Sequence, residues 1–134
     1  MNRIPVRPYA AGTAAGPVLV LSAPLSFWGG IDVTTGRVID RSHPDLGACI
    51  TGVILVMPGG RGSSSSSSVL AEAVRRGTGP IGIVLANPDP ILTVGALVAE
   101  SLYGIRCPIV VGATDALRTG VTARIEDGWL TLAG

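Results

Sequence analysis

Six consecutive serines, residues 63–68, follow a proline- and glycine-rich segment in the stretch PGGRGSSSSSS. A run rich in glycine and serine commonly forms a flexible linker between domains. This run is instead flanked directly by the apolar segment ITGVILVM at residues 50–57, typical of a buried strand, and by VLAEAVRRG, which is typical of a helix. The sequence therefore predicts a strand that ends at Met57 and a helix over residues 66–76 that begins within the serines.

The predicted strand-to-helix turn has the properties of an anion-binding site. The first turn of a helix exposes unpaired backbone N–H groups and the positive end of the helix dipole. Gly60 and Gly62 let a ligand approach the backbone, and Arg61 between them offers a bidentate grip on a carboxylate or phosphate. This field favours the alkoxide form of Ser63, which makes Ser63 the candidate general base. The alternative is that the serines only cap the helix and space it from the strand.

A second unusual stretch, SFWGGID, contributes further candidate binding residues. Phe27 and Trp28 are rare aromatics in a chain with only 4% aromatic residues, and Gly29 follows them directly. This pattern indicates either an aromatic wall beside a close backbone approach or two core anchors next to a turn. His43 precedes Pro44, which favours a loop. A single loop histidine is more often structural than catalytic, so His43 ranks below the other candidates.

Composition limits the class of function. With 134 residues, the chain is expected to form a single domain over residues 1–134. Ten basic and nine acidic residues leave no charge pattern that would bind nucleic acid or an anionic membrane. The chain is 47% hydrophobic and only 14% charged, against a usual charged share of about a quarter. We therefore expect one face to be buried against a partner.

The sequence also indicates whether the chain binds a metal and where in the cell it is located. Cys49 and Cys107 have no metal-binding spacing and are expected to be reduced core thiols. With one histidine in the chain, no metal site is expected. The N-terminal segment loosely resembles a signal peptide, but three prolines interrupt it, and no run approaches the roughly 20 apolar residues of a membrane span. We expect a cytoplasmic protein.

The remaining elements define the fold class. Short apolar runs predict strands at residues 18–21, 50–57, 80–87 and 107–112, and the lack of alternation at 80–87 fits a strand covered on both faces. Besides the helix at 66–76, Asp89 as N-cap and Gly104 at the end bracket a helix at 90–103. Turns at 34–36 and at Asp127-Gly128 predict hairpins, the second of type I′. The prediction is an α/β fold layered β/β/α, with mostly parallel central strands, flanking helices and a C-terminal hairpin.

Several of these segments, in this order and spacing, resemble the swivel-domain protein of the aconitase X family. They are SFWGGIDVTTGRVID, HPDLG, MPGGRGSSSSSSVLAE and GIVLANPDPILTVGALVAESLYGIRCPIV, within residues 12–111. The GRGSS element also resembles the Gly-x-Gly-Ser-Ser loop of ordinary aconitases, in which the first serine is the catalytic base. The resemblance assigns that role to Ser63, with Ser64 beside it. Ser65 stands where ordinary aconitases have an arginine that holds a substrate carboxylate, so a tricarboxylate substrate is not expected.

The resemblance implies that this chain is one subunit of a dehydratase. In the aconitase X family an iron–sulfur cluster belongs to a larger subunit, or to a larger part of a fused chain, so no cofactor is expected in this chain. The family activities are dehydrations of small hydroxy acids, by cis-3-hydroxy-L-proline dehydratase in bacteria and mevalonate 5-phosphate dehydratase in archaea. An arginine-only set of basic residues favours the bacterial substrate. Ser64 and the backbone around Gly62 and Ser65, with Arg61, would hold the anionic group of the substrate.

A function of a different class remains as an alternative. The same loop would serve a non-catalytic, regulatory module that binds a phosphate or carboxylate compound. That module would bind its ligand without a partner, whereas the dehydratase subunit would have little activity alone.

Overall fold

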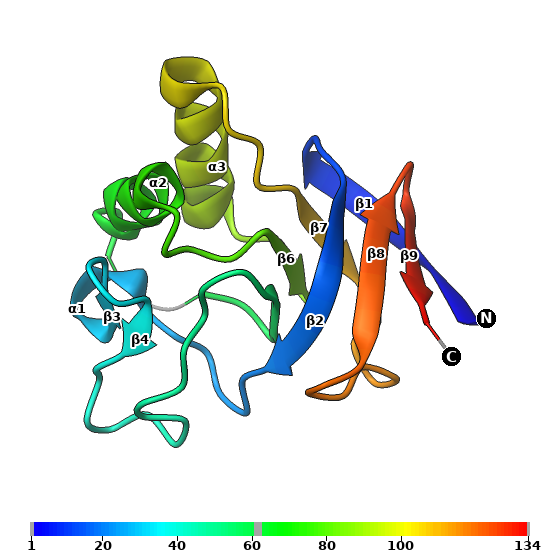
Figure 1. Cartoon of the computed structure of the whole chain (residues 1–134), viewed down its shortest axis with the longest axis horizontal. Helices are drawn as coiled ribbons and strands as arrows, with labels where there is room; N and C mark the ends of the chain where they lie inside the picture. Colours follow the sequence, from blue (N-terminus) through cyan, green and yellow to red (C-terminus); the bar gives the residue numbers. More distant parts are fainter. Residues whose placement is uncertain (1, 61–62, 134) are drawn as a thin grey trace.

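The chain folds around a closed, seven-stranded barrel with two helices on one side (Figure 1). The computed structural model describes residues 2–60 and 63–133. The barrel strands are β1 (Asn2–Ala10), β2 (Ala14–Val20), β5 (Ile54–Met57), β6 (Gly82–Leu85), β7 (Ile109–Gly112), β8 (Thr122–Glu126) and β9 (Trp129–Leu132). They follow the order β1-β7-β6-β5-β2-β8-β9 around the barrel. A separate hairpin joins β3 (Ile31–Asp32) to β4 (Arg37–Val38).

The parallel half of the barrel contains the strands that the sequence predicted. Strands β2, β5, β6 and β7 pair in parallel. Alternate residues of β5 face opposite ways: Ile54 and Val56 pack inside the barrel, whereas Leu55 and Met57 belong to the core beneath the helices. Both faces are therefore buried, which explains the continuous apolar run in the sequence.

Helices α2 (Ser66–Arg76) and α3 (Pro90–Tyr103) cover this parallel half. Helix α2 has the predicted bounds and ends at Gly77, whose left-handed φ of 77° reverses the chain. The N-cap of α3 is Asp89, as predicted: its side chain accepts hydrogen bonds from the backbone N–H groups of Ile91 and Leu92. The mixed β/β/α architecture with a mostly parallel centre is thus confirmed.

The antiparallel half includes one strand that the sequence did not predict. Strands β8 and β9 form the expected hairpin, with positive φ at both Asp127 and Gly128 as a type I′ turn requires. Strand β1 was missed because Pro5 and Pro8 lie within it. Its N-terminal half pairs with β9 and its C-terminal half with β7, so each half has one edge without a strand partner. Proline lacks an N–H and is tolerated at such an edge.

The strand predicted at residues 50–57 begins four residues later than expected. Residues 50–53 form the approach to β5, where the Ile50 N–H donates to the Gly36 carbonyl in the turn of the β3–β4 hairpin. Ile50 is fully buried although it lies outside the strand, so its apolar character reflects core packing. Among the described residues no helix is long and apolar enough to cross a membrane.

Candidate active site

A pocket of about 240 Å³ opens where β5 and β6 end and α2 and α3 begin. Ser63 and Ser66 line it from the serine run, and Pro88, Asp89 and Pro90 from the β6–α3 connection. Leu25, Gly60, Ile91 and Leu92 complete the described lining. Ligand sites of α/β folds, in open sheets and in barrels alike, lie at the carboxyl ends of the parallel strands, and this pocket occupies that position. Its volume is below the roughly 300–1,000 Å³ of drug-sized ligand sites, so it suits a small molecule.

Ser63 is the half-buried hydroxyl of this pocket. Its Oγ accepts a hydrogen bond of 3.1 Å from the Ser65 N–H, and its carbonyl oxygen accepts one of 3.0 Å from the Ser66 N–H. A backbone N–H that donates to the hydroxyl oxygen stabilises the alkoxide over the neutral alcohol. The start of α2 adds the positive end of the helix dipole. The arrangement therefore supplies a polarised oxygen that is able to accept a proton.

The other predicted residues of the serine loop are placed less centrally. Ser64 and Ser65 are exposed, and Ser64 lines a shallow neighbouring groove with Ser67 and the first turn of α3. The backbone N–H of Ser65 is already engaged with Ser63. Arg61 and Gly62 lie outside the described residues.

The SFWGG stretch divides between core and surface. Phe27 is fully buried, which matches the core-anchor alternative for this residue. Trp28 is 60% exposed, and Gly29 has a left-handed φ of 76°, so the segment α1 (Phe27–Gly30) turns away from regular helix there. Neither Phe27 nor Trp28 lines the pocket. The backbone of Trp28 nevertheless lies beside the pocket, because its N–H is bound to Ser66, which lines it.

Ser66 fixes the aromatic segment against α2. The Ser66 hydroxyl is buried and accepts a hydrogen bond of 3.0 Å from the Trp28 N–H, and it lies 3.4 Å from the Ser26 hydroxyl. Sequence analysis missed this role because nothing distinguishes one serine from its neighbours in a run of six. Only the helix register turns Ser66 inward while Ser64, Ser65 and Ser68 stay exposed.

Asp89 was predicted as the N-cap of α3, but its place in the wall of the pocket was not predicted. One carboxylate oxygen caps α3, and the other lies over Gly60, where an added Cβ would overlap it. The absence of a side chain at Gly60 therefore leaves room for the carboxylate at the pocket wall. The available clue was its place directly after a buried parallel strand, where ligand-site residues collect.

His43 has a structural role away from the pocket. Its ring is buried; Nδ1 accepts a hydrogen bond from the Asp45 N–H, and Nε2 lies 3.0 Å from the Ala23 carbonyl oxygen. Because Nδ1 accepts, Nε2 carries the proton and donates it to that carbonyl. Both nitrogens are thus engaged in fixing the loop, and His43 does not line the pocket.

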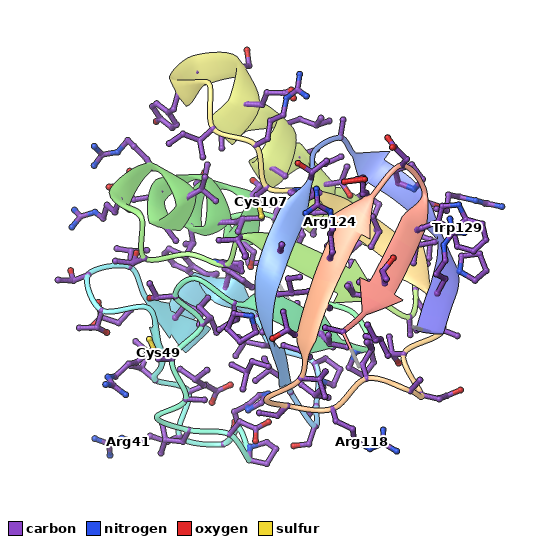
Figure 2. All side chains as sticks on the ribbon, turned by 45° about the vertical axis from the view of Figure 1, so that its right-hand side comes forward. Arg41, Cys49, Cys107, Arg118, Arg124 and Trp129 are labelled. Carbon is purple, nitrogen blue, oxygen red and sulfur yellow. The ribbon has the colours of Figure 1, made fainter. Side chains whose placement is uncertain are left out.

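The two cysteines lie in different parts of the molecule and in different environments. Figure 2 shows Cys49 near the β3–β4 hairpin and Cys107 well apart from it, close to the barrel. Burial raises the pKa of the Cys107 thiol to about 12, whereas hydrogen bonding from Thr51 lowers the pKa of Cys49. Cys107 is a core thiol as predicted, but Cys49 is only half-buried. The described residues contain no group of three potential metal ligands.

Comparison with known proteins identifies the family. The sequence profile of the aconitase X swivel domain matches residues 3–132. The chain is 46% identical over 128 residues to cis-3-hydroxy-L-proline dehydratase of Pseudomonas aeruginosa, covering 94% of this chain and 22% of that protein. It is 45% identical over 93 residues to the phosphomevalonate dehydratase small subunit of Methanothermobacter thermautotrophicus, covering 69% and 71%. It thus spans about a fifth of the longer relative.

Structural comparison agrees with the sequence comparison. The fold superimposes on the crystal structure of Thermococcus kodakaraensis aconitase X in its holo-form with a TM-score of 0.91 and 31% identity, over the full length of both chains. A solution NMR structure of a UPF0107 protein gives a TM-score of 0.86 at 32% identity, covering 99% of this chain and 100% of that one. The chain therefore belongs to the aconitase X swivel-domain family.

Proposed function

We propose that this chain is the swivel-domain small subunit of a dehydratase that removes water from cis-3-hydroxy-L-proline. Ser63 is its general base, in an active site that the chain shares with a larger subunit. The observation that carries this proposal is the position of Ser63, whose polarised hydroxyl lines a small pocket at the carboxyl ends of the parallel strands. The 46% identity to a cis-3-hydroxy-L-proline dehydratase supports the choice of reaction.

Ser63 would remove the proton next to the substrate carboxylate. Loss of water from cis-3-hydroxy-L-proline breaks the C2–H and C3–O bonds. The Ser63 alkoxide takes the C2 proton and becomes the neutral alcohol. The electron pair of the broken C2–H bond forms the C2=C3 double bond as the C3–O bond breaks. The departing hydroxide takes up one proton and leaves as water, and Ser63 releases the proton it took, which restores the alkoxide and balances the step. A positioned base of this kind contributes about 10²–10⁴-fold to a rate.

We assign binding of the substrate carboxylate to the serine loop and the residues around it. Arg61, the backbone at Gly62 and the exposed hydroxyl of Ser64 are the groups proposed to hold it, with Ser65 contributing through its bond to Ser63. Trp28 and Gly29, fixed beside the pocket by Ser66, are proposed to contact the substrate or the subunit that closes over it. Phe27 and His43, both buried, are given structural roles and no contact with the substrate.

The iron–sulfur cluster that the family implies is assigned to the larger subunit. Clusters are held by about four ligands, mostly cysteine thiolates. This chain has two cysteines, of which Cys107 is buried with its thiol directed at the Pro80 carbonyl oxygen, so its residues do not fit a cluster. We therefore assign to this chain only proton removal and anion binding.

Free cysteines suit a reducing compartment and support a cytoplasmic location.

We favour hydroxyproline over a phosphorylated substrate. No arginine is among the described residues that line it, and Asp89 adds a negative charge to its wall. A phosphate monoester carries close to two negative charges at neutral pH and would need several cationic partners there. Since phosphomevalonate dehydratase small subunits are also similar, mevalonate 5-phosphate is the second candidate substrate.

The test is a dehydration assay with both candidate substrates. The chain is co-purified with its large subunit without oxygen, and each subunit is also assayed alone. We expect turnover of cis-3-hydroxy-L-proline by the complex only. If the complex turned over mevalonate 5-phosphate and did not turn over cis-3-hydroxy-L-proline, mevalonate 5-phosphate would be assigned as the substrate instead. An isolated chain that binds carboxylates, with a Ser63→Ala change that leaves turnover of the complex unaltered, would instead support the regulatory module.

A further inference from the structure

Helix α3 is apolar on two opposite sides. Its inner side consists of Leu92, Gly95, Ala96 and Ala99, which are buried against α2 and the barrel. At Gly95 the two helices approach so closely that an added Cβ would lie 2.7 Å from the Ser67 carbonyl oxygen. The inner side alone accounts for the packing of α3 in this chain. A second apolar side that is exposed to solvent therefore needs a separate explanation.

The outer side of α3 has no cover among the described residues. We define the α3 outer face as Val94, Leu97, Val98 and Leu102, whose exposed fractions range from 37% to 66%. These four residues recur at the three- and four-residue spacing of one helix face. Four of the eleven large hydrophobic residues exposed in the described chain belong to this face. A contiguous apolar surface of this kind marks an interaction site.

Charge is sparse on this side of the molecule. Glu100 is the one charged residue of α3, and Arg106 pairs with it at 3.3 Å beyond the end of the helix. The β8–β9 side is different: Arg124 pairs with Glu126, and the Arg3 guanidinium lies 4.1 Å from the ring centre of Trp129. Figure 2 shows Arg124 and Trp129 on strands β8 and β9, and Figure 1 shows these strands on the side of the molecule away from α3. Interface cores are depleted of charge, so the α3 side is the better docking surface.

The α3 outer face adjoins the Ser63 pocket. A groove of about 210 Å³, lined by Ser64, Ser67, Pro90, Ile91 and Val94, lies between the serine turn and the first turns of α3. Pro90 and Ile91 line both this groove and the Ser63 pocket. A protein that covers the outer face therefore reaches the mouth of the pocket.

We propose that the α3 outer face is the surface on which the large subunit docks. This inference rests on the proposed function, because a pocket that supplies a base and an anion site needs a partner to assist departure of the hydroxyl group. It also fits the chain lengths: the Pseudomonas aeruginosa relative holds this domain within a protein more than four times as long.

A second copy of this chain is the less suitable occupant. Two copies joined through this face would bring two equivalent Ser63 pockets together, and neither would gain a group that the other lacks. A partner that contributes a group to the pocket explains why the apolar face borders that pocket.

The test measures binding separately from turnover. The chain with Leu97→Glu and the chain with Leu102→Glu are each titrated with purified large subunit, and the dissociation constant is measured by calorimetry. We expect at least a tenfold loss of affinity, because each change places a charge in an apolar interface. Ile39→Glu and Leu46→Glu, at residues of similar exposure on the loop around β4, serve as controls and should bind as wild type.

The outcomes separate this inference from the proposed function. Wild-type affinity in both α3 variants, with wild-type circular dichroism, would overturn the docking surface even if the complex dehydrates its substrate. Loss of affinity in these variants supports the docking surface even if no turnover is found. A wild-type chain that sediments as a dimer, and becomes a monomer with Leu97→Glu without any change in large-subunit affinity, would assign the face to self-association instead.

Discussion

The backbone N–H of Trp28 donates a hydrogen bond of 3.0 Å to the hydroxyl of Ser66, across 38 residues of sequence. This contact joins the SFWGG segment to the first turn of α2, the same turn whose preceding residues include Ser63. The two stretches that stood out in the sequence are therefore parts of one structural unit. The position of the base thus depends on a serine that does not carry out the chemistry.

Replacing Ser66 with alanine should destabilise the fold. The change leaves the Trp28 N–H in a part-buried position without its partner, which costs about 1–3 kcal/mol. Urea unfolding followed by tryptophan fluorescence measures the effect. Ser68→Ala, at an exposed position of the same helix, is the matched control and should change stability by less than about 0.5 kcal/mol. Equal stability of the two variants would contradict the structural role of Ser66.

Gly95→Ala should also destabilise the protein, although alanine is the better helix former by about 1 kcal/mol. The added methyl group would meet the Ser67 carbonyl oxygen at 2.7 Å and the Leu70 Cβ at 3.2 Å. Overpacking of this kind costs about 1–3 kcal/mol and exceeds the gain in helix propensity. Thermal unfolding measures the difference, with Ser101→Ala on the exposed side as control. A higher melting temperature for Gly95→Ala would show that α2 and α3 are less tightly packed.

Asp89 should contribute to stability as a cap, largely independent of its charge. Asp89→Ala removes the acceptor for the Ile91 and Leu92 N–H groups and should cost about 1 kcal/mol. Asp89→Asn keeps an acceptor of similar capping strength, so its cost should be a few tenths of a kcal/mol. Both free energies come from urea unfolding. An asparagine variant as unstable as the alanine variant would mean that the negative charge, rather than the cap, is required.

The two thiols should react at very different rates. Hydrogen bonding from Thr51 lowers the pKa of Cys49, so its thiolate forms at lower pH than that of an ordinary cysteine. Burial raises the pKa of Cys107 to about 12, so this thiol stays protonated and shielded in the folded chain. With a disulfide reagent at pH 8 we expect one fast equivalent and a second only after denaturation. Cys49→Ser should remove the fast phase; two equal fast phases would contradict the burial of Cys107.

The sequence predicted those parts of the molecule that local physics determines. Helix α2 and helix α3 were correctly bounded because Gly77, Asp89 and Gly104 terminate or cap them through their own conformational preferences. The Asp127-Gly128 turn was predicted for the same reason. Strand β1 was not, because its tolerance of Pro5 and Pro8 depends on which edges its neighbours leave open. Closure of the barrel likewise depends on long-range pairing that no local pattern encodes.

The candidate site also contains features that the local sequence determines and features that depend on long-range packing. The position of Ser63 at the helix start was expected from the strand–glycine–serine pattern, and the pocket lies there. The placement of Asp89 over Gly60 requires the β6–α3 connection to meet the end of β5, which only the folded sheet brings about. The inward direction of Ser66 depends on the orientation of α2 against the core. Packing, rather than residue type, separates one serine from the next.

The most direct test of the account is the turnover of cis-3-hydroxy-L-proline by the assembled complex carrying Ser63→Ala, compared with Ser64→Ala in the same preparation. We predict a loss of about 10²–10⁴-fold in kcat for Ser63→Ala, with subunit affinity unchanged, because the proton acceptor is removed. Ser64→Ala should retain more activity and show its effect mainly in KM. A Ser63→Ala complex that turns over within a few-fold of wild type would contradict the assignment of the base.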